Sequence, residues 1–347
     1  MTTTDSLFNT TTDEYNYDYN YTDYYEDELC DKTNVMQFGA IFTSVFFSIV
    51  VILSLFGNIL VIVILAKFEN LRSLTNTFIL NLAVSDLFFT AGLPFWAYSH
   101  VHGWTLGEPA CITVTFVFYV GFYSSLILLM LMTVHRYVAV MNPLSDIVST
   151  TGCYSILACL IIWVVSISIA IPGIIFTKVV QNHCVSAKSL LGIYLQNALF
   201  LLSSVVFIFC YSQIMCRLLR PTAQRRRRRT LKLIFTLMVV FFVGWAPYNV
   251  VIFLRSFYYW PKPPADSKTV ARRCAESDPL DYAFYVSRFF AFSHCCLNPV
   301  FYVFVGVKFK NHLKKMLKGW GHKKSSIRNR QSRLTITSLT SGEEFSM

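Results

Sequence analysis

The stretch FGAIFTSVFFSIVVILSLFGNILVIVILA, from Phe38 to Ala66, decides the fold. Its 29 residues include no charged side chain. A helix needs about 20 apolar residues to cross the hydrocarbon of a bilayer. Lipid offers no hydrogen bonds, so a spanning segment must satisfy its backbone polar groups internally, as a helix does. The stretch therefore predicts a membrane-spanning helix.

Six more stretches of the chain are uncharged or nearly uncharged and reach a similar length. They are Thr75–Tyr98, Cys111–Val134, Cys153–Phe176, Leu190–Met215, Leu233–Leu254 and Tyr282–Val307. The chain is 54% hydrophobic and 14% charged, whereas soluble domains carry about 25% charged residues. The sequence predicts an all-α membrane protein. It would be a seven-transmembrane helix bundle over residues 38–307, between an N-tail of residues 1–37 and a C-terminal region of residues 308–347.

Basic residues predict how the bundle lies in the membrane. Of the 30 Lys and Arg residues, 21 lie in the first and fifth connections, at the end of the third span, or after Val307. Basic residues close to spans stay on the cytoplasmic side. We expect a plasma-membrane protein with an extracellular N-terminus and a cytoplasmic C-terminus. The net charge of +11 is then a sign of topology, and nucleic acid is not an expected partner.

The N-tail is strongly acidic. Nine Asp and Glu residues precede Lys32, the first basic residue, and six tyrosines are interleaved with them, Tyr15, Tyr17, Tyr19, Tyr21, Tyr24 and Tyr25. Such a tail is either an inert solvated segment or an electrostatic lure for a basic ligand. We favour the lure, with the tyrosines as candidate sulfation sites. Asn9 and Asn20 begin N-glycosylation sequons. Because residues 1–37 lack the apolar run of a cleavable signal peptide, we expect the first span to export the tail.

Four of the ten cysteines are predicted to face the oxidising exterior, Cys30, Cys111, Cys184 and Cys274. Four cysteines allow three pairings, and the sequence by itself does not choose among them. The other six lie in spans or at their ends, where most are expected to be small buried apolar residues.

Two full charges lie deep in the spans, Asp86 and Arg288. Each costs about 2.5–3.5 kcal/mol at a helix centre on insertion scales, so both should face the bundle interior or water. Asn58 and Asn298 are the expected partners of Asp86. The group is either a structural polar knot or an ion site that works as a switch, and both roles are compatible.

Prolines lie inside four of the predicted spans, Pro94, Pro172, Pro247 and Pro299. A proline removes a helical hydrogen bond and clashes with the preceding turn, so we expect a kink at each. The kinks in spans six and seven are candidate hinges.

Short motifs in five of the spans resemble the rhodopsin-like G-protein-coupled receptors. They are Gly57-Asn58, Asn81-Leu82-Ala83-Val84-Ser85-Asp86, Trp163, Trp245-Ala246-Pro247-Tyr248 and Asn298-Pro299-Val300-Phe301-Tyr302. Each motif is weak alone, but their order and placement together are specific. The resemblance runs from about Phe38 to Leu317.

Further motifs resemble the chemokine receptors within that family. They are Leu93-Pro94-Phe95-Trp96, Trp104-Thr105-Leu106-Gly107 and His294-Cys295-Cys296-Leu297-Asn298-Pro299. The stretches Ser73–Leu82, Thr133–Tyr137, Thr230–Phe235 and Ala291–Cys296 look like the XC-type (lymphotactin) receptors. Two departures from the wider family agree, because Ser203 replaces the usual proline of span five and Arg288 replaces a usual glutamate.

The resemblance implies disulfides Cys111–Cys184 and Cys30–Cys274. It also implies a basic chemokine ligand, captured by the tail through Tyr15, Tyr17, Tyr19 and Tyr21. The ligand's N-terminus would enter a cavity whose candidate contacts are Trp96, Phe118, Tyr119, Tyr248, Tyr285 and Arg288. Residues implied in switching and G-protein coupling are His135, Arg136, Tyr137, Tyr211, Trp245, Pro247, Asn298, Pro299 and Tyr302. Candidate sodium ligands are Asp86, Ser125 and Asn298.

Several positions depart from the family pattern. His135 stands where an aspartate usually precedes the arginine, and Gly92 stands where a threonine is usual. His294 and Cys295 replace polar residues that help to bind sodium in many relatives, which weakens the sodium site.

The C-terminal region predicts a short amphipathic cytoplasmic helix over Lys308–Leu317, with Phe309, Leu313, Met316 and Leu317 on one face. No cysteine follows Cys296, so we expect no palmitoylation of the tail. The hydroxyls near the end are candidate phosphorylation sites for receptor kinases, followed by arrestin binding. They are Ser332, Thr335, Thr337, Ser338, Thr340 and Ser341.

The expected function is that of an XC-type chemokine receptor that activates a heterotrimeric G protein of the inhibitory class. The alternative is a non-signalling, atypical scavenger receptor, which the altered motif at Arg136 would suit. Span seven has no lysine for retinal, and the chain shows no repeat symmetry of a transporter. No enzyme motif occurs, so we predict neither catalysis nor a cofactor.

Overall fold

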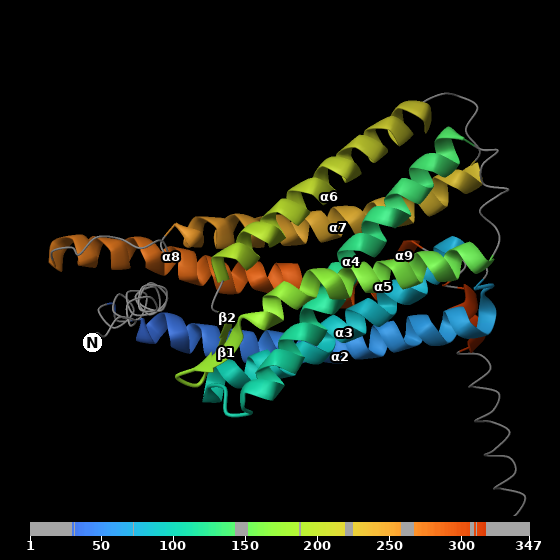
Figure 1. The fold of residues 1–347 in the computed structure, drawn as a ribbon. Helices are drawn as coiled ribbons and strands as arrows, with labels where there is room; N and C mark the ends of the chain where they lie inside the picture. The colour runs from blue at the N-terminus through green and yellow to red at the C-terminus, as the bar shows by residue number, and fades with distance from the viewer. Residues whose placement is uncertain are drawn as a thin grey trace, which may run out of the picture.

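The computed structural model describes residues 30, 32–71, 73–142, 152–186, 189–218, 225–257, 267–305, 309 and 311–316. Helices run roughly side by side along one direction (Figure 1). They are α2 (Thr33–Phe68), α3 (Leu74–His102), α4 (Glu108–Met141), α5 (Gly152–Ile175), α6 (Ser189–Leu218), α7 (Arg225–Ser256), α8 (Ser267–Phe292) and α9 (His294–Val305).

Six helices of the described part are long and apolar enough to cross a membrane, α2 to α7. The seventh crossing is divided, because α8 ends at Phe292 and α9 begins at His294. The predicted seven-helix bundle is therefore confirmed, although its last span differs from the single stretch expected. Outward side chains remain apolar, as a lipid-facing surface requires: on α2, Phe56 is 72% exposed, whereas Val61 is fully buried.

A β-hairpin that the sequence analysis did not predict lies between α5 and α6. Its strands β1 (Thr177–Val180) and β2 (His183–Ser186) are antiparallel, with Val179 opposite Cys184. The turn residues Gln181 and Asn182 have φ values of 47° and 60°, which matches the right-handed twist of a tight hairpin. The hairpin lies at the end of the bundle where α2 begins (Figure 1).

Two disulfides mark this same end, which we call the disulfide end. Cys30, just before α2, is bonded to Cys274 of α8, and their Cα atoms are 5.6 Å apart. Cys111 of α4 is bonded to Cys184 of β2, with Cα atoms 5.7 Å apart. These are the pairings that the family resemblance implies.

The proline of α9 explains where Asn58 binds. Pro299 has no N–H to donate to the carbonyl of Cys295, four residues earlier. The side-chain amide of Asn58 donates to that carbonyl at 2.9 Å and to the Ser54 carbonyl at 3.0 Å. The prediction that Asn58 would bond to Asp86 was wrong. Asn58 instead satisfies a backbone carbonyl that would otherwise be unpaired in lipid. Asn298 does donate to Asp86, at 2.8 Å.

Beyond α9, Phe309 and residues 311–316 are helical. Phe309 packs against the main core of the bundle. Leu313 and Met316 are half-buried, whereas Lys314 and Lys315 are exposed. This is the pattern expected of the amphipathic helix, and Leu317 lies outside the described residues.

The helices α3 and α4 approach each other closely at Gly121. A β-carbon there would lie 2.8 Å from the Ser85 carbonyl oxygen and would also overlap the backbone nitrogen of Phe89. Both obstacles are backbone atoms of α3, so no side-chain rotation can relieve the overlap.

We therefore expect Gly121→Ala to push α3 away from α4 and to destabilise the bundle by about 1–3 kcal/mol, as overpacking does. The measurement is the thermal unfolding midpoint of the purified receptor in detergent. Gly192→Ala is the matched control, because nothing lies within 4 Å of a β-carbon at that position. Equal midpoints for the two variants would contradict the close approach.

Candidate functional site

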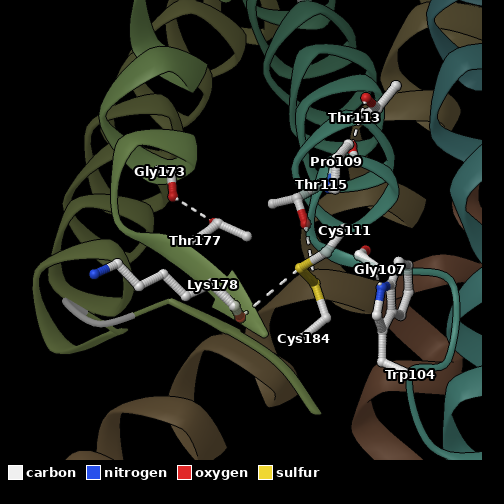
Figure 2. The surroundings of a disulfide bond; sticks show 10 residues. All are labelled: Trp104, Gly107, Pro109, Cys111, Thr113, Thr115, Gly173, Thr177, Lys178 and Cys184. Atoms are coloured by element: carbon white, nitrogen blue, oxygen red, sulfur yellow. Dashed lines mark hydrogen bonds between the residues drawn. A yellow bond between two sulfur atoms is a disulfide. The ribbon is translucent and has the colours of Figure 1, made fainter. Parts of the chain in front are cut away.

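The Cys111–Cys184 disulfide anchors the hairpin to α4 (Figure 2). Beside it, the indole N–H of Trp104 donates to the Gly107 carbonyl at 2.8 Å, and the Trp104 backbone N–H donates to the Asn182 carbonyl at 2.5 Å. Trp104 is 1% exposed. Gly107 has a φ of 80°, a value that glycine adopts without strain. The predicted Trp104–Gly107 motif thus ties the α3–α4 connection to the hairpin.

An ion cluster lies beside the Cys30–Cys274 disulfide. Asp281 of α8, 7% exposed, is 2.9 Å from Arg255 of α7 and 3.4 Å from Lys32, the residue before α2. One carboxylate therefore links three helices at the disulfide end. None of these three residues was named as a site residue, because their meeting depends on helix packing.

The predicted ligand contacts lie within one aromatic cluster. Phe118 of α4 is 6.2 Å from the Trp96 ring and 5.5 Å from the Tyr119 ring, between centroids. Phe292 joins the two sides of the cluster, at 5.4 Å from Phe118 and 6.0 Å from Tyr248. Aromatic pairs at these separations hold one another in defined orientations.

Phe284 completes the cluster toward the disulfide end. Its ring is 5.8 Å from Tyr248 and 5.6 Å from Tyr285. The structure thus brings together aromatic residues from α3, α4, α7 and α8 that the sequence analysis named separately. Phe284 and Phe292 were missed, although their spacing of four residues on either side of Arg288 places them on its helix face.

Arg288 extends from α8 into this cluster. Its guanidinium carbon lies 5.4 Å from the Phe284 centroid, 6.0 Å from Tyr285 and 5.7 Å from Phe292. These distances are within reach of cation–π attraction. The guanidinium also donates to His100 of α3 at 2.8 Å. His100 was not predicted, but it lies one helical turn after Trp96, on the same face of α3.

Trp245 lies next to the aromatic cluster, toward the middle of the bundle, and is 2% exposed. Its ring is 4.5 Å from Phe122, 5.7 Å from Tyr248 and 5.4 Å from His294. Pro247 follows two residues later within α7. Trp245 therefore lies between the candidate ligand contact Tyr248 and His294.

The polar centre contains the candidate sodium ligands. Asp86 accepts from Ser125 at 3.1 Å and from Asn298 at 2.8 Å, and it is fully buried. His294 donates from Nδ1 to the Ala291 carbonyl at 2.7 Å, and its Nε2 is 3.8 Å from an Asp86 oxygen. The three predicted ligands do meet, and sodium binding stays a prediction.

The opposite end of the bundle holds the predicted coupling residues. Arg136 donates to the hydroxyl of Thr75, which ties α4 to α3. The ring of Tyr137 lies 5.9 Å from that of Phe209 of α6, in a tilted arrangement, and Tyr211 of α6 is 5% exposed. His135 is half-buried. Tyr302 belongs to α9, and its side chain is outside the described part.

Several predicted sites lie outside the described residues. They are Tyr15, Tyr17, Tyr19, Tyr21, Asn9 and Asn20 of the N-tail, and Ser332, Thr335, Thr337, Ser338, Thr340 and Ser341 of the C-terminal region.

Comparison with known proteins identifies the family of this chain. The family model of 7 transmembrane receptors (rhodopsin family) matches residues 57–302. The human protein named Chemokine XC receptor 1 is 42% identical over 285 residues, which are 81% of this chain and 83% of that protein. The mouse Chemokine XC receptor 1 is 42% identical over 292 residues, which are 83% of this chain and 86% of that protein. The chain therefore belongs to the rhodopsin family of seven-transmembrane receptors and, within it, to the chemokine receptors.

Proposed function

We propose that this receptor binds a basic XC-type chemokine and activates a heterotrimeric G protein of the inhibitory class. The observation that carries the proposal is the 42% identity to two XC receptors over more than four-fifths of the chain. Chemokine ligands and G-protein partners are general in this family. The XC ligand and the inhibitory class are the specific parts of the proposal.

The proposed orientation puts the disulfide end outside the cell and the chain in the plasma membrane. Disulfides persist in an oxidising exterior, and the basic connections lie at the other end, as cytoplasmic segments do. The acidic N-tail, held to α8 by the Cys30–Cys274 bond, then lies where a soluble chemokine arrives. Arrestin, recruited after phosphorylation of the hydroxyls at the C-terminal end, is the further cytoplasmic partner we propose.

The proposed signal passes from the aromatic cluster to Trp245 and then to the polar centre. Ligand binding shifts the bundle only by as much as it favours one arrangement over the other. The prolines of α7 and α9 and the break at Ser293 are the places where these helices can bend. Arg136 and Tyr137 at the opposite end then meet the G protein.

The proposal predicts that an XC chemokine lowers cyclic AMP in cells that express this chain, after adenylyl cyclase has been stimulated. Pertussis toxin should abolish the fall, because it uncouples inhibitory G proteins. Arg136→Ala is the control: it should remove the response while labelled chemokine still binds. Uptake of chemokine without any fall in cyclic AMP would contradict the proposal and favour a scavenger receptor.

The N-tail charge should act mainly on the rate of association. We expect the combined Tyr→Phe change at 15, 17, 19 and 21 to slow chemokine association and to flatten its dependence on salt, because sulfation adds negative charge to the tail. Surface plasmon resonance on receptor in nanodiscs measures both quantities. Unaltered association kinetics across salt concentrations would rule out this role of the tyrosines.

His135 should raise signalling in the absence of ligand. An aspartate there could pair with Arg136, and such a partly solvated pair is worth about 1 kcal/mol or less, enough to change the active fraction several-fold. We expect His135→Asp to lower basal signalling and to keep the chemokine response, with His135→Asn as the uncharged control. The readout is cyclic AMP without ligand at matched surface expression, and an unchanged basal level in His135→Asp would reject the idea.

A further inference from the structure

The guanidinium of Arg288 is held among aromatic rings. Besides the three rings of its own helix, Phe47 of α2 lies 4.9 Å from the guanidinium carbon. A ring face attracts a cation, so the rings position Arg288 without neutralising it. We call Arg288 with Phe47, Phe284, Tyr285 and Phe292 the arginine cage.

The polar partners of Arg288 are both neutral. Its NH2 nitrogen is 2.8 Å from His100 Nε2 and 3.4 Å from the Thr43 hydroxyl. A guanidinium only donates, so His100 accepts at Nε2 and its ring is uncharged. Among the described residues, no carboxylate lies within 4.0 Å of Arg288. Within the described part of the chain, Arg288 donates from one nitrogen, Nη2, which leaves most of the five N–H donors of a guanidinium for a further acceptor.

Asp281, the acidic residue on the same face of α8 as Arg288, already has two cationic partners. Asp281 lies two helical turns before Arg288 and is bound by both Arg255 and Lys32. Arg255 also lies 4.3 Å from the Phe284 centroid, which makes it a direct neighbour of the arginine cage. Lys32, Arg255, Arg288 and Asp281 together carry two surplus positive charges. This group would repel an amine and attract an anion.

We propose that the arginine cage is an anion-accepting subsite, which binds a carboxylate in the N-terminal segment of the ligand. The inference rests on the proposed function, because a chemokine supplies that segment. A carboxylate can accept two parallel N–H bonds from a guanidinium, and it replaces the weaker neutral acceptor His100. Arg288 is half-buried, so much of its field is shielded from water.

The subsite and the N-tail then select opposite charges on one ligand. The nine acids of the tail attract a basic body, whereas the arginine cage accepts an acidic tip. A chemokine whose N-terminal segment offers only amines would be held by the tail and rejected by the cage. Specificity of this kind combines attraction of the right partner with repulsion of the wrong one.

The test is a double-mutant cycle on receptor and ligand. The probe is a synthetic XC chemokine, made in its natural form and with every Asp and Glu of its N-terminal segment replaced by Asn and Gln. The receptor variants are Arg288→Gln, Arg288→Lys and, as the matched control, Arg272→Gln, whose side chain is 76% exposed in an exposed pair with Glu276. Potency in the cyclic AMP assay is compared at equal surface expression.

We expect the amide ligand to lose potency on the natural receptor by about 10-fold or more, the lower range for close charge pairs at interfaces. Arg288→Gln should lose a similar factor with the natural ligand, and little more with the amide ligand. The potency of the natural ligand on Arg288→Lys should lie between its potencies on the natural receptor and on Arg288→Gln. Lysine keeps the positive charge but cannot make two parallel N–H bonds to a carboxylate. Arg272→Gln should match the natural receptor. Independent, multiplicative losses, or an amide ligand of full potency, would overturn the subsite.

The carboxylate could also come from the receptor's own acidic tail. Deleting residues 2–29 together with Asp31→Asn keeps Cys30 and removes that source, because Asp31 is the one tail acid outside the deleted stretch. If the ligand supplies the group, the coupling between Arg288 and the ligand carboxylates persists in the shortened receptor at higher ligand concentration. If the coupling disappears there, the assignment to the ligand is wrong.

A separate measurement distinguishes failure of the subsite from failure of the proposed function. If the natural receptor ignores XC chemokine, the proposed function is wrong, and the cage is tested by a simple dicarboxylate. Purified receptor should melt at a higher temperature in sodium glutarate than in sodium chloride of equal ionic strength, and Arg288→Gln should lose that difference. An equal shift in both proteins would overturn the anion site.

Discussion

Lipid supplies no hydrogen bonds, and the arrangement of this receptor follows from that constraint. Every backbone polar group within the bundle must find a partner on its own helix or on a neighbour, and polar side chains gain from the same pairing. Asp86 therefore joins α3 to α4 and α9 through Ser125 and Asn298. Asn58 joins α2 to α9 through the carbonyl that Pro299 leaves unpaired. The indole N–H of Trp163 donates to Asn81 at 3.0 Å and joins α5 to α3.

The same constraint supports our proposal that Arg288 has a functional role as well as a structural one. Asp86 has its hydrogen-bond donors inside the protein, and Asp281 has two cations. Arg288 has aromatic faces and neutral acceptors instead. Charged residues at membrane depth are costly and are usually retained for a function. A ligand group that completes the missing pair gains more there than it would at a solvated surface, because water competes less for the bond.

Much of the fold could be predicted from the sequence, because uncharged stretches of sufficient length have few alternatives in a membrane. The family motifs likewise supplied the disulfide pairs. What could not be predicted depends on packing between helices. The break at Ser293 follows no proline at that position, and the β1–β2 hairpin is too short to give a clear periodic signal. Asn58 and Asp86 are both polar and buried, and only the packed structure shows that Asn58 turns to Cys295. The contact between His100 and Arg288 likewise joins residues 188 positions apart.

We propose that a ligand carboxylate completes the interaction left open at Arg288, and a structure of the receptor determined with an XC chemokine bound tests this proposal. We expect a carboxylate oxygen of the ligand's N-terminal segment about 2.7–2.9 Å from a guanidinium nitrogen, with His100 no longer the main acceptor. An N-terminal segment that passes Arg288 without a carboxylate contact, while Arg288 stays bonded to His100, would contradict it.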